Sequence, residues 1–132
     1  MQLKNLPKCP VETTLSLIGD KWKILIIRDL LNGTKRFGEL KKQCSGISQK
    51  VLTTNLRAME DDGLIIRKEF KQKPPRVEYT LSDVGYSLGE VLNAMANWGD
   101  GYKTYLKLLA KRNSWICLAW QLWKIFKLCI IL

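Results

Sequence analysis

The hydrophobic pattern of this chain changes from a helical to a strand period at Gly63 and returns to a helical period at Ser82, and these changes set narrow limits on the fold. Before Gly63, apolar residues recur at the spacing of amphipathic helices. After it, residues 64–70 and 76–81 read as two short strands, joined by a basic loop that Pro74 and Pro75 stiffen. Ser82 then begins a last helix. We therefore expect a mainly α fold with a small β-hairpin, in the order four helices, hairpin, helix.

The four helices before the hairpin are predicted at residues 10–18, 21–31, 37–44 and 48–62. Pro10 suits a first helical turn, and Ser48 is a favourable N-cap. In the fourth helix Leu52, Leu56 and Met59 fall on one side, which is expected to face the core.

The opposite side of the fourth helix is rich in hydrogen-bond donors. Two short helices joined by a tight turn and followed by a hairpin form a winged helix-turn-helix, whose second helix enters the DNA major groove. Donors of this kind suit base edges, and a basic hairpin suits phosphates or the minor groove. The alternative is that these side chains form only a solvated face. The candidate DNA-binding residues are Ser48, Gln49, Lys50, Thr53, Thr54 and Arg57 on the helix, and Lys71, Lys73 and Arg76 on the hairpin.

Charge and residue usage narrow the possible functions. The chain has 22 basic and 12 acidic residues, a net charge of +10 that suits nucleic acid or an anionic membrane surface. Histidine is absent, which excludes a Ser-His-Asp triad, a histidine general base and histidine-ligated metal. The four cysteines form no CxxC pair. We therefore expect a protein that is not an enzyme and that uses no metal and no cofactor.

The first ten residues are polar and do not read as a secretory leader. The expected compartment is the cytoplasm, whose reducing conditions keep thiols free at rest.

Several dispersed motifs resemble those of one regulator family. They are CPVE at 9–12, IGDKW at 18–22, RFGEL at 36–40, GISQKVLT at 46–53, LR at 56–57, DGLI at 62–65 and VEYTL at 77–81, followed by Gly85. Over residues 9–102 the chain is similar to HxlR-type regulators. The resemblance implies a homodimeric winged helix-turn-helix transcription factor that binds double-stranded DNA and dimerises through its first and last helices. A two-fold dimer would read half-sites about one helical turn apart.

Several HxlR-type regulators sense oxidants or electrophiles through the cysteine just before the first helix, which is Cys9 here. Cys9 follows Lys8 and precedes a predicted helix start, and both features favour the thiolate. The alternative is an inert cysteine near the dimer seam. Cys44, at the end of the third helix, is expected to be structural, and the alternative is a sensing pair with a cysteine of a second subunit.

Trp22 and Trp98 are interpreted as core or dimer-interface aromatics, and the alternative is that they line an effector pocket.

The last thirty residues differ in composition from the rest. Residues 103–132 hold six basic residues and no acidic one, and residues 114–132 are almost entirely apolar apart from a helical stripe with Gln121, Lys124 and Lys127. We predict a DNA-binding domain at 1–102 and a basic, apolar tail at 103–132. Three interpretations of the tail stay open: burial against the domain or dimer, contact with a membrane surface, which is not favoured, or a coding end without a selected role.

A competing hypothesis is a membrane-associated or protein-docking module that keeps the winged-helix fold without reading DNA. A docking helix would more often expose apolar anchors than the polar side predicted for residues 48–62. Transcriptional regulation is therefore the leading expectation.

Overall fold

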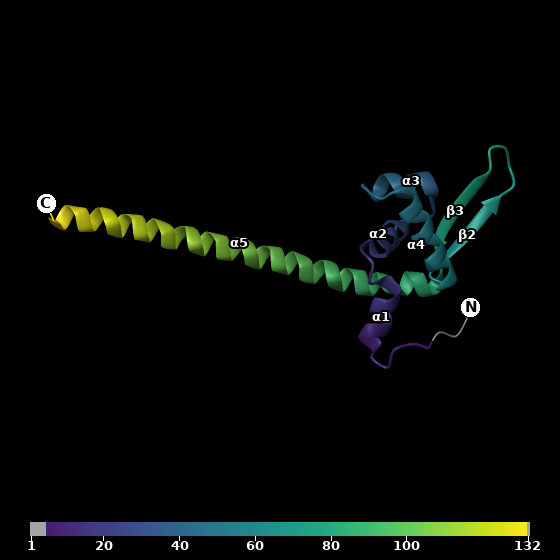
Figure 1. Ribbon diagram of the computed structural model, residues 1–132, viewed down its shortest axis with the longest axis horizontal. Helices are drawn as coiled ribbons and strands as arrows, with labels where there is room; N and C mark the ends of the chain where they lie inside the picture. The colour runs from purple at the N-terminus through teal and green to yellow at the C-terminus, as the bar shows by residue number, and fades with distance from the viewer. Residues whose placement is uncertain (1–4, 132) are drawn as a thin grey trace. The chain divides into compact units, whose positions relative to one another are not determined.

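The computed structural model describes the backbone of residues 5–131 and the side chains of residues 5–123. The chain divides into two units, Met1–Leu92 and Asn93–Leu132, and the helix-turn-helix elements all lie in the first. In chain order the elements are α1 (Pro10–Ile18), α2 (Lys21–Leu30), β1 (Lys35–Arg36), α3 (Phe37–Gln43), α4 (Gln49–Asp61), β2 (Ile65–Phe70), β3 (Arg76–Leu81) and α5 (Asp83–Ile131) (Figure 1). The predicted order of helices and hairpin is confirmed, with boundaries shifted by one or two residues.

Side-chain caps explain where α2, α4 and α5 begin. Asp20 Oδ1 accepts a hydrogen bond from the backbone N–H of Trp22 at 2.9 Å, and Ser48 Oγ accepts one from Val51 N–H at 3.2 Å. Each cap satisfies a backbone donor that has no partner inside the helix. Ser82 Oγ does the same for the N–H of Gly85, at 3.1 Å, where α5 begins.

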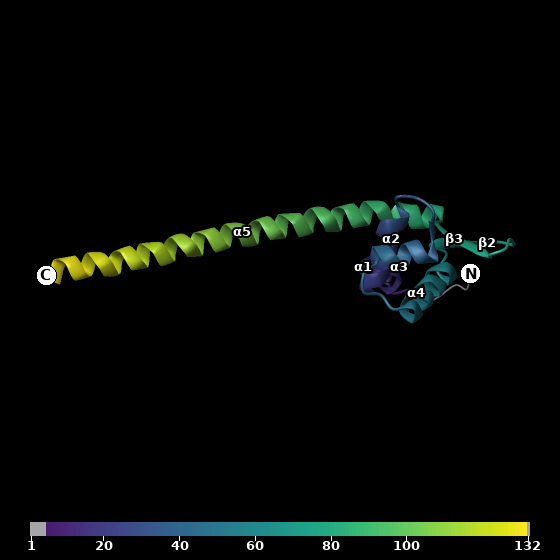
Figure 2. The same ribbon diagram turned by 90° about the horizontal axis from the view of Figure 1, so that it is seen from above.

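The sheet has three antiparallel strands in the order β1-β3-β2. The hairpin pairs Ile65 with Leu81 and Phe70 with Arg76, and its loop extends away from the helices in both views (Figures 1 and 2). The short β1 adds to the other edge of β3 and was not predicted. Two residues are too few to show alternation, so β1 follows from pairing and not from a local pattern.

The core of the first unit forms around α2, whose Ile26, Ile27 and Leu30 are fully buried. The inner side of α4 packs against it with Leu52, Leu56 and Met59, which confirms the buried side predicted from the spacing. Trp22 is half-buried against this core. Substituting such residues with alanine typically costs about 2–5 kcal/mol, so this packing fixes the orientation of α4.

A polar cluster lies inside this core. Asp29 is buried; its Oδ1 accepts hydrogen bonds from Arg28 at 2.8 and 3.0 Å, and its Oδ2 accepts one from Cys44 Sγ at 3.4 Å. Burial raises the pKa of the Cys44 thiol to about 11, and Asp29 adds to the effect through its hydrogen bond and its charge. Cys44 is therefore a neutral thiol that joins α3 to α2.

The helix α5 runs from Asp83 to Ile131 and so includes residues on both sides of the predicted boundary at 102. Trp98 is exposed and stacks on Tyr102, with ring centroids 5.4 Å apart, so it is not part of the core of the single chain. The predicted stripe through Lys124 and Lys127 lies outside the side chains that the structure describes. Among the described residues, no helix has a stretch long and apolar enough to cross a membrane.

Candidate nucleic-acid interface

A short turn places α4 relative to α3. Gly46 has φ of +90°, a backbone conformation that glycine adopts without steric cost. The N–H of Ile47 donates to the carbonyl of Cys44 at 3.1 Å, and the Ile47 side chain is buried. The turn is therefore held by packing as well as by hydrogen bonding, as a helix-turn-helix requires if its second helix is to be presented rigidly.

The outer side of α4 carries the predicted contact residues. Gln49, Lys50, Thr54 and Arg57 are exposed and Thr53 is half-buried. These side chains project from a helix whose other side is fixed in the core. The structure thus places the polar set on one element, at the N-terminal and middle turns that a recognition helix offers to base edges.

The hydroxyl groups on α4 already have local partners. Thr53 Oγ1 donates to the Gln49 carbonyl at 2.8 Å, and Thr54 Oγ1 donates to the Lys50 carbonyl at 2.9 Å. Ser48 Oγ is used in the helix cap. The two threonines are therefore left with acceptor lone pairs and methyl groups, which suit a cytosine or adenine amino group or a thymine methyl group.

The three basic residues of the hairpin differ in their surroundings. Lys71 and Lys73 are exposed on the loop between β2 and β3. Arg76 is half-buried, donates from Nε to Glu78 Oε1 at 2.7 Å, and lies over the Phe70 ring with its guanidinium carbon 5.3 Å from the centroid. Lys71 and Lys73 are thus better placed than Arg76 to meet phosphates.

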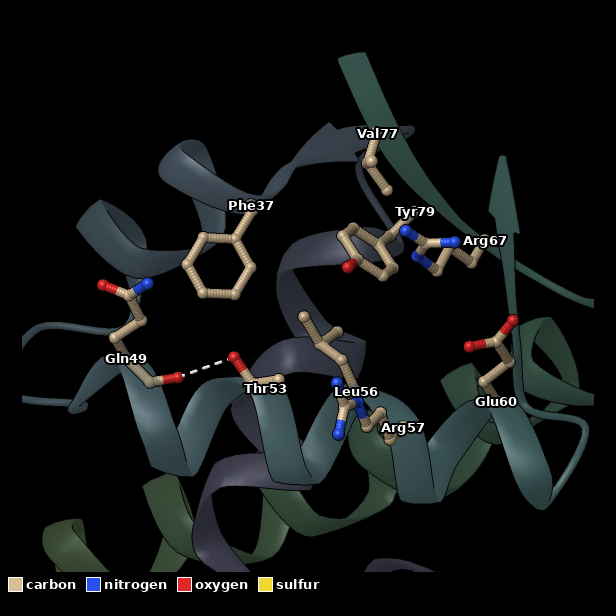
Figure 3. Close-up of a pocket in the computed structure, with 9 residues that line it drawn as sticks. All are labelled: Phe37, Gln49, Thr53, Leu56, Arg57, Glu60, Arg67, Val77 and Tyr79. Atoms are coloured by element: carbon tan, nitrogen blue, oxygen red, sulfur yellow. Dashed lines mark hydrogen bonds between the residues drawn. The ribbon is translucent and has the colours of Figure 1, made fainter. Parts of the chain in front are cut away.

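A groove of about 570 Å³ lies between α4 and the sheet (Figure 3). We call the β2–β3 hairpin with its loop the wing, and this groove the α4–wing groove. Three predicted DNA-binding residues, Gln49, Thr53 and Arg57, line one wall. The remaining lining residues are Phe37, Leu56, Glu60, Arg67, Val77 and Tyr79.

Arg67 was missed by the sequence analysis. It lies directly opposite Tyr79 in the pairing of β2 with β3, so both side chains are on the same face of the hairpin. A hydrogen bond with Tyr79 is the largest cause of a raised pKa at Arg67. The register, once known, is the signal that places this arginine in the groove.

Cys9 lies at the N-terminus of α1. It is exposed, and it occupies the N-cap position without making a side-chain cap. Its carbonyl accepts hydrogen bonds from the N–H and the hydroxyl of Thr13, at 3.0 and 3.2 Å. Cys9 does not line the α4–wing groove, so any effect of Cys9 on DNA binding would act at a distance.

The HxlR-like helix-turn-helix family matches residues 17–106 of the chain. The chain belongs to this family. The match includes α2, the α3–α4 unit and the wing, and it ends inside α5. Its members are transcriptional regulators and not enzymes. The resemblance to HxlR-type regulators and the expectation that the protein is not an enzyme are therefore both confirmed.

Individual relatives agree with this assignment. The HTH-type transcriptional regulator YdeP of Bacillus subtilis is 47% identical over 107 residues, which are 80% of this chain and 84% of YdeP. The redox regulator HypR in its oxidised form is 42% identical with a TM-score of 0.67, covering 70% of this chain and 96% of HypR. The reduced form of the transcriptional regulator YodB from B. subtilis is 37% identical with a TM-score of 0.63, covering 71% of this chain and 93% of YodB. The protein is thus a transcriptional regulator with a winged helix-turn-helix.

Proposed function

We propose that this regulator reads a specific DNA sequence by placing α4 in the major groove. The observation that carries the proposal is the division of α4 into an inner side held in the core and an outer side of exposed amide, ammonium and guanidinium groups. Gln49, Lys50 and Arg57 would contact base edges. Ser48, Thr53 and Thr54 would contact phosphates, amino groups or thymine methyl groups.

The wing has a different proposed role. Lys71, Lys73 and Arg76 would engage the DNA backbone or the minor groove and so fix the register of α4 without reading sequence. The exposure of Lys71 and Lys73 supports this division of labour. The DNA-binding part would be residues 1–102, acting in the cytoplasm.

The regulator is proposed to act as a homodimer through its first and last helices. Exposed apolar side chains on α1 and α5 support this, since Val11, Leu15 and Trp98 are 66, 59 and 72% exposed in the single chain. A two-fold dimer presents two copies of α4, which would bind half-sites about one helical turn apart.

Cys9 is proposed to be a switch that responds to oxidants or electrophiles. The exposure of its side chain and its place at the start of α1 support this role. In the proposed dimer, α1 is part of the interface between the subunits. HypR, which is described as a redox regulator, and YodB add support by similarity. Modifying a thiol at the seam would change the separation of the two α4 helices and so weaken binding to paired half-sites.

Selection of bound sequences from random DNA by the purified full-length protein tests the proposed function. The expected result is an inverted repeat whose half-sites are about 10 base pairs apart, centre to centre. Recovery of unrelated sequences, bound with the same affinity as bulk DNA, would contradict sequence-specific reading.

A further inference from the structure

The α4–wing groove has an apolar floor, which contact with DNA phosphates does not require. Leu56 is buried, and Phe37 and Val77 are half-buried along the groove (Figure 3). Its volume of about 570 Å³ falls within the range of small-molecule sites, about 300–1,000 Å³. The groove is therefore large enough for a flat molecule of two fused rings.

The residues that line the groove carry a net charge of +1, which suits a ligand with one negative charge; Glu69, which pairs with Arg67, lies outside the lining. Arg57 enters from α4 and Arg67 from β2, and Glu60 is the one carboxylate among the lining residues. The carboxylate of Glu60 would repel a DNA phosphate at its end of the groove, but it accepts hydrogen bonds from a neutral donor. The preferred ligand thus combines a single anionic group with a hydrogen-bond donor.

Arg67 is oriented by neighbouring side chains before any ligand arrives. Its Nη1 donates to Glu69 Oε2 at 3.2 Å, and it lies directly opposite the buried Tyr79 in the pairing of β2 with β3. In Figure 3 the Arg67 and Tyr79 side chains lie beside each other at one wall of the groove. A guanidinium oriented by a neighbouring carboxylate binds a ligand carboxylate with a smaller loss of side-chain entropy than an unpaired one.

We propose that the α4–wing groove binds a flat apolar molecule carrying one carboxylate and one hydrogen-bond donor, and that this ligand competes with DNA. The carboxylate pairs with Arg57 and Arg67, the ring system lies on the apolar floor, and the donor meets Glu60. Arg57 cannot serve a ligand carboxylate and a base edge together, so each partner lowers the affinity for the other by the same factor. The competition rests on the proposed DNA-reading role of α4, whereas the ligand site does not.

The ligand site is tested on the full-length protein without DNA. The probe is 6-hydroxy-2-naphthoate, whose fluorescence reports binding. Two controls are 2-naphthol, which lacks the carboxylate, and 2-naphthoate, which lacks the donor. Arg67→Gln should weaken both carboxylates about tenfold, as expected when a charged hydrogen bond is lost, and leave 2-naphthol unchanged. Lys68→Gln removes the same charge from the next residue of β2, outside the groove lining, and should change none of the three affinities.

Competition is tested with the DNA sequence obtained by selection. The expected result is that 6-hydroxy-2-naphthoate weakens DNA binding by the wild type and by Lys68→Gln, and that Arg67→Gln resists it. Absence of carboxylate binding at millimolar concentration, or equal losses in Arg67→Gln and Lys68→Gln, would overturn the ligand site. Loss of DNA affinity in Arg67→Gln without probe binding to the wild type would also overturn it, because the groove would then be part of the DNA surface.

One outcome separates this inference from the proposed function. A protein that binds the probe through Arg67 but selects no DNA sequence would support the ligand site and contradict sequence-specific reading. A protein that selects a DNA sequence but binds no probe would do the reverse.

Discussion

Arg57 is the residue whose role best separates base reading from general attraction to DNA. It is exposed on the outer side of α4, and its guanidinium can donate two hydrogen bonds to one guanine. Arg57→Ala should therefore cost about 1–3 kcal/mol on the selected sequence and relax the base preference at one position. Titration of the wild type and the variant with selected and random DNA measures both effects. An equal loss on the two DNAs would leave Arg57 as a phosphate contact.

The two cysteines of the first unit should differ sharply in reactivity. Cys9 is exposed, whereas Cys44 is buried and donates its S–H to Asp29. The pKa of the Cys44 thiol, about 11, leaves little thiolate at neutral pH. A mild electrophile should therefore modify Cys9 much faster than Cys44 and weaken DNA binding. Peptide mass mapping against time gives the order of modification, and Cys9→Ser should keep DNA binding insensitive to the reagent. If DNA binding by the wild type is unaffected after Cys9 is fully modified, Cys9 is no switch.

At the scale of residues, spacing predicted burial well but not partners. Leu52, Leu56 and Met59 were expected in the core from their spacing alone, and they are buried. Asn55, on the same side, is also buried. Its side-chain amide donates to the Val51 carbonyl at 3.0 Å, which offsets the cost of removing that amide from water, and no spacing rule reveals this hydrogen bond. The pairing of Arg76 with Glu78 was equally hidden, since it depends on side-chain orientation.

Among the elements, the wing is expected to contribute affinity without specificity. Lys71→Ala and Lys73→Ala should each weaken binding to selected and random DNA alike, because a phosphate contact carries no sequence information. Each should also reduce the slope of log affinity against log salt concentration by about 1. Lys111→Ala, an exposed lysine beyond the family match, is the matched control and should leave the slope unchanged. A variant that altered base preference without changing the slope would show that the wing reads sequence.

The start of α5 packs closely against Leu64, which directly precedes β2, and against Leu81 at the end of β3. A Cβ at Gly85 would lie well inside van der Waals contact with the Leu64 carbonyl oxygen and 3.0 Å from Leu81 Cδ2. Gly85→Ala should therefore destabilise the fold by about 1–3 kcal/mol. Gly38 is also helical, but a methyl group there would meet open space beyond its own helix, so Gly38→Ala should be neutral or stabilising. Urea midpoints measure both, and equal effects would contradict the steric argument.

The elements that the sequence predicted are those whose own residues show a helical or strand spacing of apolar side chains. The α4 helix shows its cap and its buried side, and β2 and β3 flank a proline-stiffened loop. By contrast, β1 consists of Lys35 and Arg36 and exists because β3 offers an unpaired edge. The α4–wing groove is likewise a product of tertiary pairing, since Arg67 and Gln49 are on different elements.

In the whole molecule, the buried core of the described residues and nearly all of the family match belong to the first part of the sequence rather than to the tail. Among the side chains of residues 5–123, every buried hydrophobic residue of the core lies at or before Leu92, and the family match ends at residue 106. Beyond it, Trp115, Trp120 and Trp123 are 74, 67 and 68% exposed in the single chain. Folding and DNA reading should therefore be carried by the first part, whereas the tail needs another surface to cover its apolar side chains.

A chain ending at Tyr102 should accordingly stay folded, dimerise and bind the selected DNA within about twofold of the full-length protein, because every proposed contact residue lies before that point. Circular dichroism, sedimentation and DNA titration measure the three properties. Full-length protein should show tail tryptophans shielded from quenchers if the tail is buried in the dimer. Partition into anionic vesicles would instead assign the tail to a membrane surface, since its basic residues complement that charge. Loss of dimerisation on truncation would contradict the division at residue 102 and make the tail part of the regulator's core assembly.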